Sequence, residues 1–210
     1  MYMFATKRIT TIFAMLAIAL LSLSCSNDTD TTLTSQQKAI ENYLKNSHNP
    51  RLIEEINIPD SMDEEPQFYT HWALNVFRYI ATYYDEGRDS KPIISKGTTF
   101  YIRYTAYTFK SGAPSIKDMF ATNDQAKIDE LYRGYDDENV WSNEPMRITL
   151  GKQELVSGLE KALNGCREGD KIEVYLTFEA AYGKDYIGMV PSKSAVMWDI
   201  EILEVQESRV

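Results

Sequence analysis

The stretch from residue 150 to residue 163 constrains the fold more than any other part of the chain. Gly151 provides a turn at its start, and Gly165 can close its end in a left-handed conformation. Between them, five apolar residues repeat with the spacing of one helical face: Leu155, Val156, Leu159, Ala162 and Leu163. The pattern predicts a short helix over residues 154–163. Residues 169–178 read as a strand, so we expect a strand–helix–strand unit.

Three other segments have the composition of β-strands. Residues 72–84 are rich in aromatic and β-branched side chains and precede an Asp-Glu-Gly turn. Residues 98–109 alternate between two faces, as a strand does. Residues 195–205 place four apolar side chains on one face, namely Val196, Trp198, Ile200 and Ile202. Together these segments predict a sheet that packs against the helix.

Three segments are expected to lie outside this minimal unit. Residues 33–46 form an amphipathic pattern that predicts a helix, with Ala39, Ile40, Tyr43 and Leu44 on one face. Residues 52–66 mix isoleucines with acids and two prolines, which favours extended chain or loop. The third segment is an insertion at about residues 113–144, and it contains a helix predicted over residues 124–133.

The N-terminus has the pattern of an export signal. Lys7 and Arg8 precede an apolar run over residues 12–21, which is too short for a membrane span of about 20 residues. Ser22-Leu23-Ser24-Cys25 then resembles a lipobox, so we expect residues 1–24 to be cleaved and Cys25 to be lipidated. The alternative is an ordinary signal peptide that leaves a free Cys25. Residues 25–33 read as a polar tether.

The charge of the chain excludes some partners. The formal net charge is −9, and removal of residues 1–24, which hold two basic residues and no acid, takes it to −11. Such a surface argues against nucleic-acid binding and against electrostatic attachment to anionic lipid. We therefore expect the lipid on Cys25 to anchor the protein in the cell envelope. The remaining cysteine, Cys166, has no neighbour that would activate it, and we expect a buried structural thiol.

Common catalytic groups are missing from the sequence. His48 and His71 lack metal-ligand spacing, and we interpret both as surface or capping residues. The chain also lacks a phosphate-binding glycine loop, a Gly-x-Ser-x-Gly motif and a Cys-x-x-Cys motif. The sequence therefore predicts neither a metal nor a cofactor.

Several motifs in one order carry a family resemblance. The run L-G-K-Q-E-L-V-x-G-L-E-x-A-L at residues 150–163, then G-C-R-E-G-D, A-Y-G and V-P, resembles the FK506-binding-protein (FKBP) type of peptidyl-prolyl cis-trans isomerase. The resemblance implies an α+β fold, with a twisted, largely antiparallel sheet wrapped around a short central helix. It assigns residues 72–207 to the FKBP-like domain and residues 34–71 to an N-terminal extension.

The resemblance also implies a site. It places one group of residues around an apolar pocket: Tyr104, Phe120, Met146, Leu155, Val156, Leu159, Tyr182 and Trp198, with Asp185 or Tyr186 in the adjoining loop. In the family, ligand carbonyls are held by the backbone N–H at the Val156 position and by the hydroxyl at the Tyr182 position. Leu159 would carry the proline ring, walled by Trp198, Tyr104 and Phe120. For each residue, plain core packing is the alternative.

This chain departs from the family pattern at two places in the expected site. Leu159 stands where the family often has Trp, and Ala121 stands where it has an Asp if Phe120 is the family's aromatic residue. An ungapped alignment places Ser115 and Ile116 there instead. The resemblance implies a peptidyl-prolyl isomerase that acts on exported, Pro-containing polypeptides. The alternatives are a non-catalytic peptide-binding or chaperone lipoprotein, and a structural lipoprotein whose pocket is filled by its own insertion.

Overall fold

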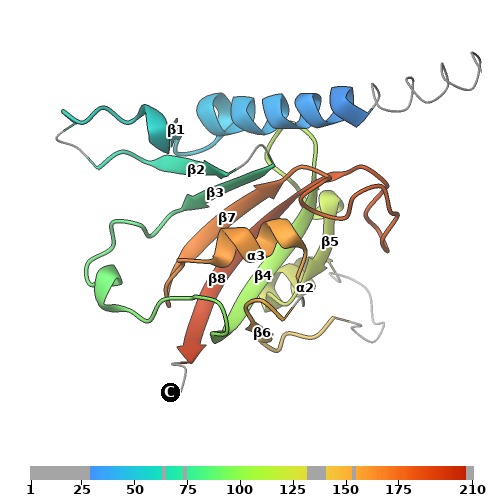
Figure 1. Cartoon of the computed structure of the whole chain (residues 1–210). Helices are drawn as coiled ribbons and strands as arrows, with labels where there is room; N and C mark the ends of the chain where they lie inside the picture. Colours follow the sequence, from blue (N-terminus) through green and yellow to red (C-terminus); the bar gives the residue numbers. More distant parts are fainter. Residues whose placement is uncertain (1–28, 63–64, 73–74, 132–140, 153–154, 207–210) are drawn as a thin grey trace, which may run out of the picture. The chain divides into compact units, whose positions relative to one another are not determined.

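The computed structural model describes residues 29–62, 65–72, 75–131, 141–152 and 155–206 (Figure 1). Contacts divide the chain into two units, Met1–Ser35 and Gln36–Val210. In the first unit, residues 29–35 are helical. The expected signal peptide and Cys25 lie outside the described residues. Within the described ranges, none of the helices combines the length and apolar character that a membrane span requires.

The second unit is built on one mixed sheet. Its strands follow the order β1-β2-β3-β7-β8-β4-β5, and β6 pairs with the same strand as β5 does. Every pairing is antiparallel except that of β1 with β2. The strands are β1 (Ile53–Glu54), β2 (Phe68–Trp72), β3 (Val76–Ile80), β4 (Thr99–Phe109), β5 (Met119–Thr122), β6 (Met146–Thr149), β7 (Lys171–Leu176) and β8 (Ala195–Gln206). The long β4 pairs with β8 along its whole length, which makes these two strands the centre of the sheet.

Short helices connect and cover the strands. Helix α3 (Ser157–Leu163) lies across one face of the sheet, as Figure 1 shows, and α2 (Gln125–Leu131) follows β5. Residues 36–42 are α-helical and continue into a π-helical turn, η1 (Tyr43–Ser47). Three 3-10 turns complete the elements: η2 (Glu55–Asn57), η3 (Arg88–Ser90) and η4 (Ile116–Asp118).

The sheet has an apolar core on each face. Alternation along β8 sends Trp198 and Ile200 into the cluster beneath α3, which we call the first core, and Met197 into the opposite one, the second core. The second core includes Ile40, Tyr43 and Leu44 from the N-terminal extension. The predicted helical face at residues 39–44 is therefore buried on the sheet at these three positions.

Several predicted elements have different bounds in the structure: the chain is helical already at residue 29, within the expected tether and before the helix predicted from residue 33, and β7 is shorter than the strand predicted over residues 169–178. The single strand over residues 72–84 is wrong, because β2 ends at Trp72, β3 begins at Val76 and the chain leaves the sheet after Ile80. The helix predicted from residue 154 begins only at Ser157. Residue Val156 is extended (φ −62°, ψ 146°), and its carbonyl accepts hydrogen bonds from the N–H groups of residues 159 and 160.

Gly158 explains how close α3 can approach the chain after β7. Its N–H donates to the carbonyl of Ala180 at 3.0 Å. A Cβ at this position would lie 2.6 Å from that carbonyl oxygen and 2.8 Å from a methyl carbon of Leu176. Only glycine fits here without displacing backbone, so the glycine within the helix motif sets the distance between α3 and the segment that carries Tyr182.

Candidate functional site

Four aromatic rings from separate parts of the chain meet on the α3 face of the sheet; we call them the ring cluster. Trp198 of β8 packs against Tyr104 of β4, with 5.1 Å between ring centroids and a tilt of 32°. Phe120 of β5 lies edge-on to Trp198 at 6.1 Å and to Tyr182 at 6.0 Å. Only Trp198 is nearly buried, at 6% exposure, while the other three are half-buried. The cluster thus combines a buried floor with partly open walls.

Aliphatic residues complete the surroundings. Leu159, on α3, is fully buried in the first core, at 0% exposure. Met146, Leu155 and Val156 are half-buried and pack against the same core. The structure therefore brings eight of the expected site residues to one side of the sheet, around or beneath the ring cluster.

Three hydrogen-bond donors at this place have no acceptor among the residues that the structure describes. The indole Nε1 of Trp198 is buried and, among the described residues, has no acceptor. No carbonyl or side chain in the described ranges accepts a hydrogen bond from the Val156 N–H or the Tyr182 hydroxyl. Of the three, the Trp198 Nε1 is a buried donor without a partner in those ranges, which costs about 1–3 kcal/mol. These donors could therefore meet acceptors on a bound molecule.

The tyrosines of the ring cluster remain protonated at neutral pH. Burial raises the pKa of the Tyr104 hydroxyl above its ordinary value. Burial, and to a lesser degree the charge of Tyr104, raise the pKa of the Tyr182 hydroxyl as well. Both groups can donate hydrogen bonds at neutral pH, and neither can act there as a base.

The loop after Tyr182 extends away from the ring cluster. Tyr186 is 70% exposed, and Ile187 and Met189 in the same loop are also exposed. The structure thus leaves Tyr186 in the adjoining loop, without a ring contact to Phe120, Trp198 or Tyr182. Its expected role in substrate binding stays a prediction.

The position of Phe120 bears on the two alignments of the insertion. Phe120 contacts Trp198 and Tyr182, whereas Ile116 packs against the second core. Ala121 is half-buried beside the first core and stands opposite Ala106 in the pairing of β5 with β4. The geometry agrees with the alignment that uses Phe120, and it leaves no carboxylate at the neighbouring position.

Asn123 supports the site, and the sequence did not single it out. Its Oδ1 accepts from the Tyr104 N–H at 2.7 Å, and its Nδ2 donates to the carbonyls of Ile102 and Glu144, both at 3.0 Å. Buried asparagine needs such partners, so these bonds hold β4, β5 and the end of the insertion together. The available signal was the polar Thr-Asn-Asp run that directly follows Phe120 and Ala121.

Of the two roles expected for His48, surface residue is wrong and capping residue is confirmed, because His48 is the C-cap of η1 and its backbone N–H donates to the Tyr43 carbonyl at 2.8 Å. It is 6% exposed, its Nδ1 is hydrogen-bonded to the Pro50 carbonyl, and its Nε2 lies 3.0 Å from the Glu173 carboxylate. The hydroxyl of Tyr175 donates to the same carboxylate oxygen. Burial lowers the pKa of His48, but the bonds to Glu173 and Pro50 and the charge of Glu173 outweigh it and raise that pKa overall.

The prediction for Cys166 is confirmed. The thiol is fully buried, and burial raises its pKa to about 11. Its Sγ lies 3.3 Å from the carbonyl of Ala162. A thiol that stays protonated and shielded from solvent serves the packing of α3 on the sheet.

Comparison with known proteins defines the class that this fold and site represent. The model of the family described as FKBP-type peptidyl-prolyl cis-trans isomerase matches residues 93–203, more than half of the chain. The chain belongs to this family, and the expected FKBP-like α+β fold is confirmed. The match contains β4 to β7, most of β8 and every residue of the ring cluster.

Individual relatives are distant. An FK506-binding protein of Neisseria meningitidis is 28% identical over 72 residues, which are 34% of this chain and 66% of that protein. The mouse peptidyl-prolyl cis-trans isomerase FKBP14 is 29% identical over 31% of each chain. The chain thus spans just under two thirds of the bacterial relative. Among solved structures, the N-terminal domain of FKBP42 from Arabidopsis thaliana has a TM-score of 0.48 and 23% identity, over 72% of this chain and 99% of that one.

Proposed function

We propose that this protein is an active peptidyl-prolyl cis-trans isomerase that binds Pro-containing segments of exported polypeptides at the ring cluster. The observation that carries the proposal is the meeting of Tyr104, Phe120, Tyr182 and Trp198 over the buried Leu159, with donors left unpaired beside them. Family membership supports the reaction, and the arrangement supports this face as its place.

The chemistry of the reaction suits such a surface. Rotation about an X–Pro bond meets a barrier of about 18–20 kcal/mol, because the amide loses its resonance as it twists. The twisted amide has a less polar carbonyl, so an apolar surface favours it over the planar form. In this proposal the rings hold the proline, and the Val156 N–H and Tyr182 hydroxyl hold the flanking carbonyls.

A protease-coupled isomerisation assay on a Pro-containing peptide tests the proposal. We expect the purified protein to accelerate isomerisation, and Trp198→Leu to lower kcat/KM at least about tenfold because it opens the floor to water. Tyr182→Phe keeps the ring and removes one hydrogen bond of about 0.5–1.5 kcal/mol, so we expect a loss of about two- to tenfold. Tyr101→Phe is the matched control, since Tyr101 belongs to neither core.

Two other results decide against catalysis at this face. Binding of the peptide without any acceleration would indicate a binding or chaperone module; Leu159 and Ala121, where the family resemblance expects Trp and Asp, motivate that alternative. Wild-type rates in folded Trp198→Leu would mean that the reaction occurs elsewhere. Circular dichroism and thermal unfolding establish that each variant is folded.

We also propose that the protein is a lipid-anchored component of the cell envelope. The apolar run over residues 12–21 and the small residues before Cys25 support this assignment. Cys25→Ala should abolish labelling by a fatty-acid analogue and release the protein into the soluble fraction. Unchanged membrane partitioning of this variant would rule the anchor out.

A further inference from the structure

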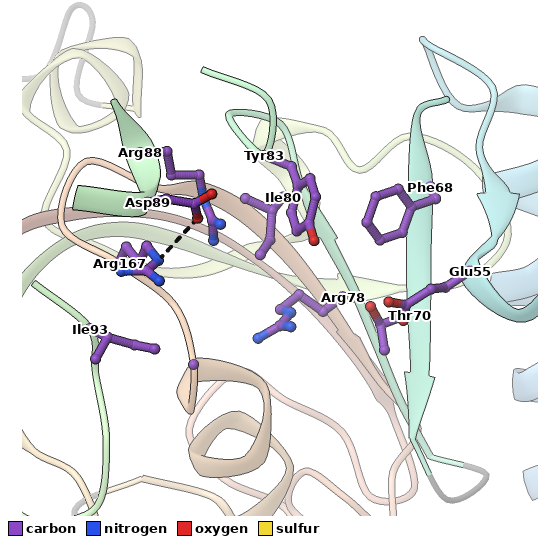
Figure 2. Close-up of a pocket in the computed structure, with 11 residues that line it drawn as sticks. Glu55, Phe68, Thr70, Arg78, Ile80, Tyr83, Arg88, Asp89, Ile93 and Arg167 are labelled. Carbon is purple, nitrogen blue, oxygen red and sulfur yellow. Dashed lines mark ion pairs between the residues drawn. The ribbon is translucent and has the colours of Figure 1, made fainter. Parts of the chain in front are cut away.

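A cavity lies away from the ring cluster, between the β2–β3 hairpin and the segment around η3. It has a volume of about 280 Å³, and Figure 2 shows the guanidinium groups of Arg78 and Arg167 directed toward the same space. Arg88 also lines it. Three guanidinium groups around one small cavity stand out in a chain whose net charge is −9.

The partners of Arg78 are all neutral. Its Nη1 donates to the carbonyls of Ala162 and Asn164 at the end of α3, and its guanidinium carbon lies 4.4 Å from the centre of the Trp72 ring. Its Nε is buried and, within the described part of the chain, has no hydrogen-bond partner. No ion pair among the described residues neutralises this charge, so the guanidinium brings a positive potential to the cavity.

The other two arginines differ in how firmly they are paired. Arg88 forms two hydrogen bonds with the buried carboxylate of Asp170, at 2.7 and 2.8 Å, so its charge is compensated. Arg167 Nε lies 3.7 Å from a carboxylate oxygen of Asp89, whose side chain is 96% exposed. An ion pair with a solvated partner is worth little, so a ligand can compete with Asp89 for Arg167.

The acidic residues of the lining, Asp89 and Glu55, are both exposed, whereas Arg88 and Arg167 are largely buried. Water therefore screens the negative charges at the rim more than the positive charges within. Phe68, Tyr83 and Ile93 add apolar surface to the walls, which also include Ile80, Thr70 and Gly165. The cavity thus combines the N–H donors of guanidinium groups with adjacent aromatic side chains.

We propose that this cavity is a binding site for an oxyanion, carboxylate or phosphate, carried on a small aromatic or apolar group. A guanidinium pairs with the two oxygens of such a group through parallel N–H donors, which an ammonium cannot do. The volume lies just below the range of about 300–1,000 Å³ for drug-sized ligands, so a single ring with its anionic group fits. The site is independent of the isomerase proposal.

Isothermal titration calorimetry on the full chain, at constant ionic strength, tests the site. The probes are phenylacetate, phenyl phosphate and the neutral phenylacetamide. We expect saturable binding of either anion, at least about tenfold tighter than that of phenylacetamide, because the amide lacks the charge. Ala-Ala-Phe with a free carboxylate separates two sources of the ligand. Tighter binding than phenylacetate indicates a polypeptide end, and equal or weaker binding indicates a free small molecule.

Matched variants locate the binding. Arg167→Gln should weaken phenylacetate about tenfold, whereas Arg103→Gln, which removes the same charge from an exposed pair elsewhere on the sheet, should change it less than about twofold. Asp89→Asn removes the competing carboxylate and should tighten binding about threefold, with Asp185→Asn as its control. Arg78→Lys keeps the charge but loses the fork, and should weaken binding.

Three results would overturn the proposal. They are the absence of saturable binding of both anions, equal binding of phenylacetamide, and equal losses in Arg167→Gln and Arg103→Gln. The last would mean that phenylacetate responds to overall charge and not to this cavity. Thermal unfolding curves establish that the Arg78 variant retains its fold, since Arg78 also holds the end of α3.

Discussion

The two faces of the sheet differ in how the polar groups at their apolar cores are hydrogen-bonded. On the face beneath α3, the ring cluster is half-buried, and the buried N–H of Trp198 has no partner in the described part of the chain. On the other face, the N-terminal extension covers Tyr175, and His48, Glu173 and the Tyr175 hydroxyl satisfy one another. The α3 face thus has an unpaired donor at the ring cluster, and the second face pairs the three polar groups of this network, although the buried Tyr69 hydroxyl of the second core also has no hydrogen-bond partner among the described residues.

This difference predicts that the second face contributes mainly to stability and the α3 face mainly to activity. Unpaired donors and half-buried rings contribute less to folding than they could, which is typical of surfaces that bind a ligand. A buried, fully paired network contributes to folding and offers a ligand nothing. We therefore expect changes on the second face to alter stability alone, and changes on the α3 face to alter activity.

The largest effect should come from breaking the paired network. His48→Ala removes one of the two partners of the Glu173 carboxylate oxygen, leaving the Tyr175 hydroxyl, and also removes ring contacts to Tyr43 and Tyr79, so we expect a loss of about 3 kcal/mol in the free energy of unfolding. The isomerase kcat/KM of the folded protein should not change. Urea unfolding and the isomerase assay measure the two quantities.

The matched control is the other histidine. His71 stacks on Phe77 and is only half-buried, so His71→Ala should cost less, about 1 kcal/mol. Equal losses of unfolding free energy in the two variants would mean that the His48 network stabilises the protein no more than the stacking of His71 does. A fall in activity with His48→Ala would contradict the separation of the two faces.

A smaller loss of stability, accompanied by a loss of activity, should follow from Gly158→Ala. The added Cβ meets backbone and methyl atoms at 2.6–2.8 Å, and such overpacking costs about 1–3 kcal/mol despite the better helix propensity of alanine. Because α3 and the segment of Tyr182 must move apart, kcat/KM should fall too. Gly112→Ala, which has open space around its Cβ and no positive φ, should be nearly neutral by both measurements.

The contrast between the faces also explains what the sequence could predict. The α3 face is encoded locally: a helical apolar face, a glycine at Gly158 and the A-Y-G run with Tyr182 all lie within short motifs. The network of the second face is not encoded in a short motif, because His48 and Glu173 are 125 residues apart and neither has a diagnostic neighbour. The β2–β3 hairpin was missed for a similar reason, since residues 72–76 contain neither Gly nor Pro to mark a turn.

A titration should separate the faces without large structural change. The pKa of His48 is raised in the folded protein, so its contribution to stability is complete below the unfolded pKa of about 6.5 and is lost as pH rises through the folded value. The difference in unfolding free energy between wild type and His48→Gln should therefore shrink above about pH 6.5. A constant difference across this range would contradict the raised pKa.

Activity should not follow that titration. The pKa values of Tyr104 and Tyr182 are raised above the ordinary tyrosine value of about 10, so the ring cluster has no group that changes charge between about pH 6 and 9. We expect a flat pH profile of kcat/KM over this range. A bell-shaped profile would indicate acid–base chemistry at the α3 face.

The smallest change concerns Ala121. The family resemblance places an acid beside the aromatic residue that Phe120 represents, and the structure sets Ala121 half-buried against the same core. Ala121→Asp should raise kcat/KM or ligand affinity about two- to threefold, because the carboxylate adds a polar contact at the edge of the ring cluster. Partial burial of the charge should cost stability, about 1 kcal/mol. Ala113→Asp, at an exposed position of the same insertion, controls for added charge. Two results would contradict this prediction: no change in activity or affinity with Ala121→Asp, or the same gain in both variants. Either would mean that residue 121 does not face the bound proline and that the α3 face works without a carboxylate there.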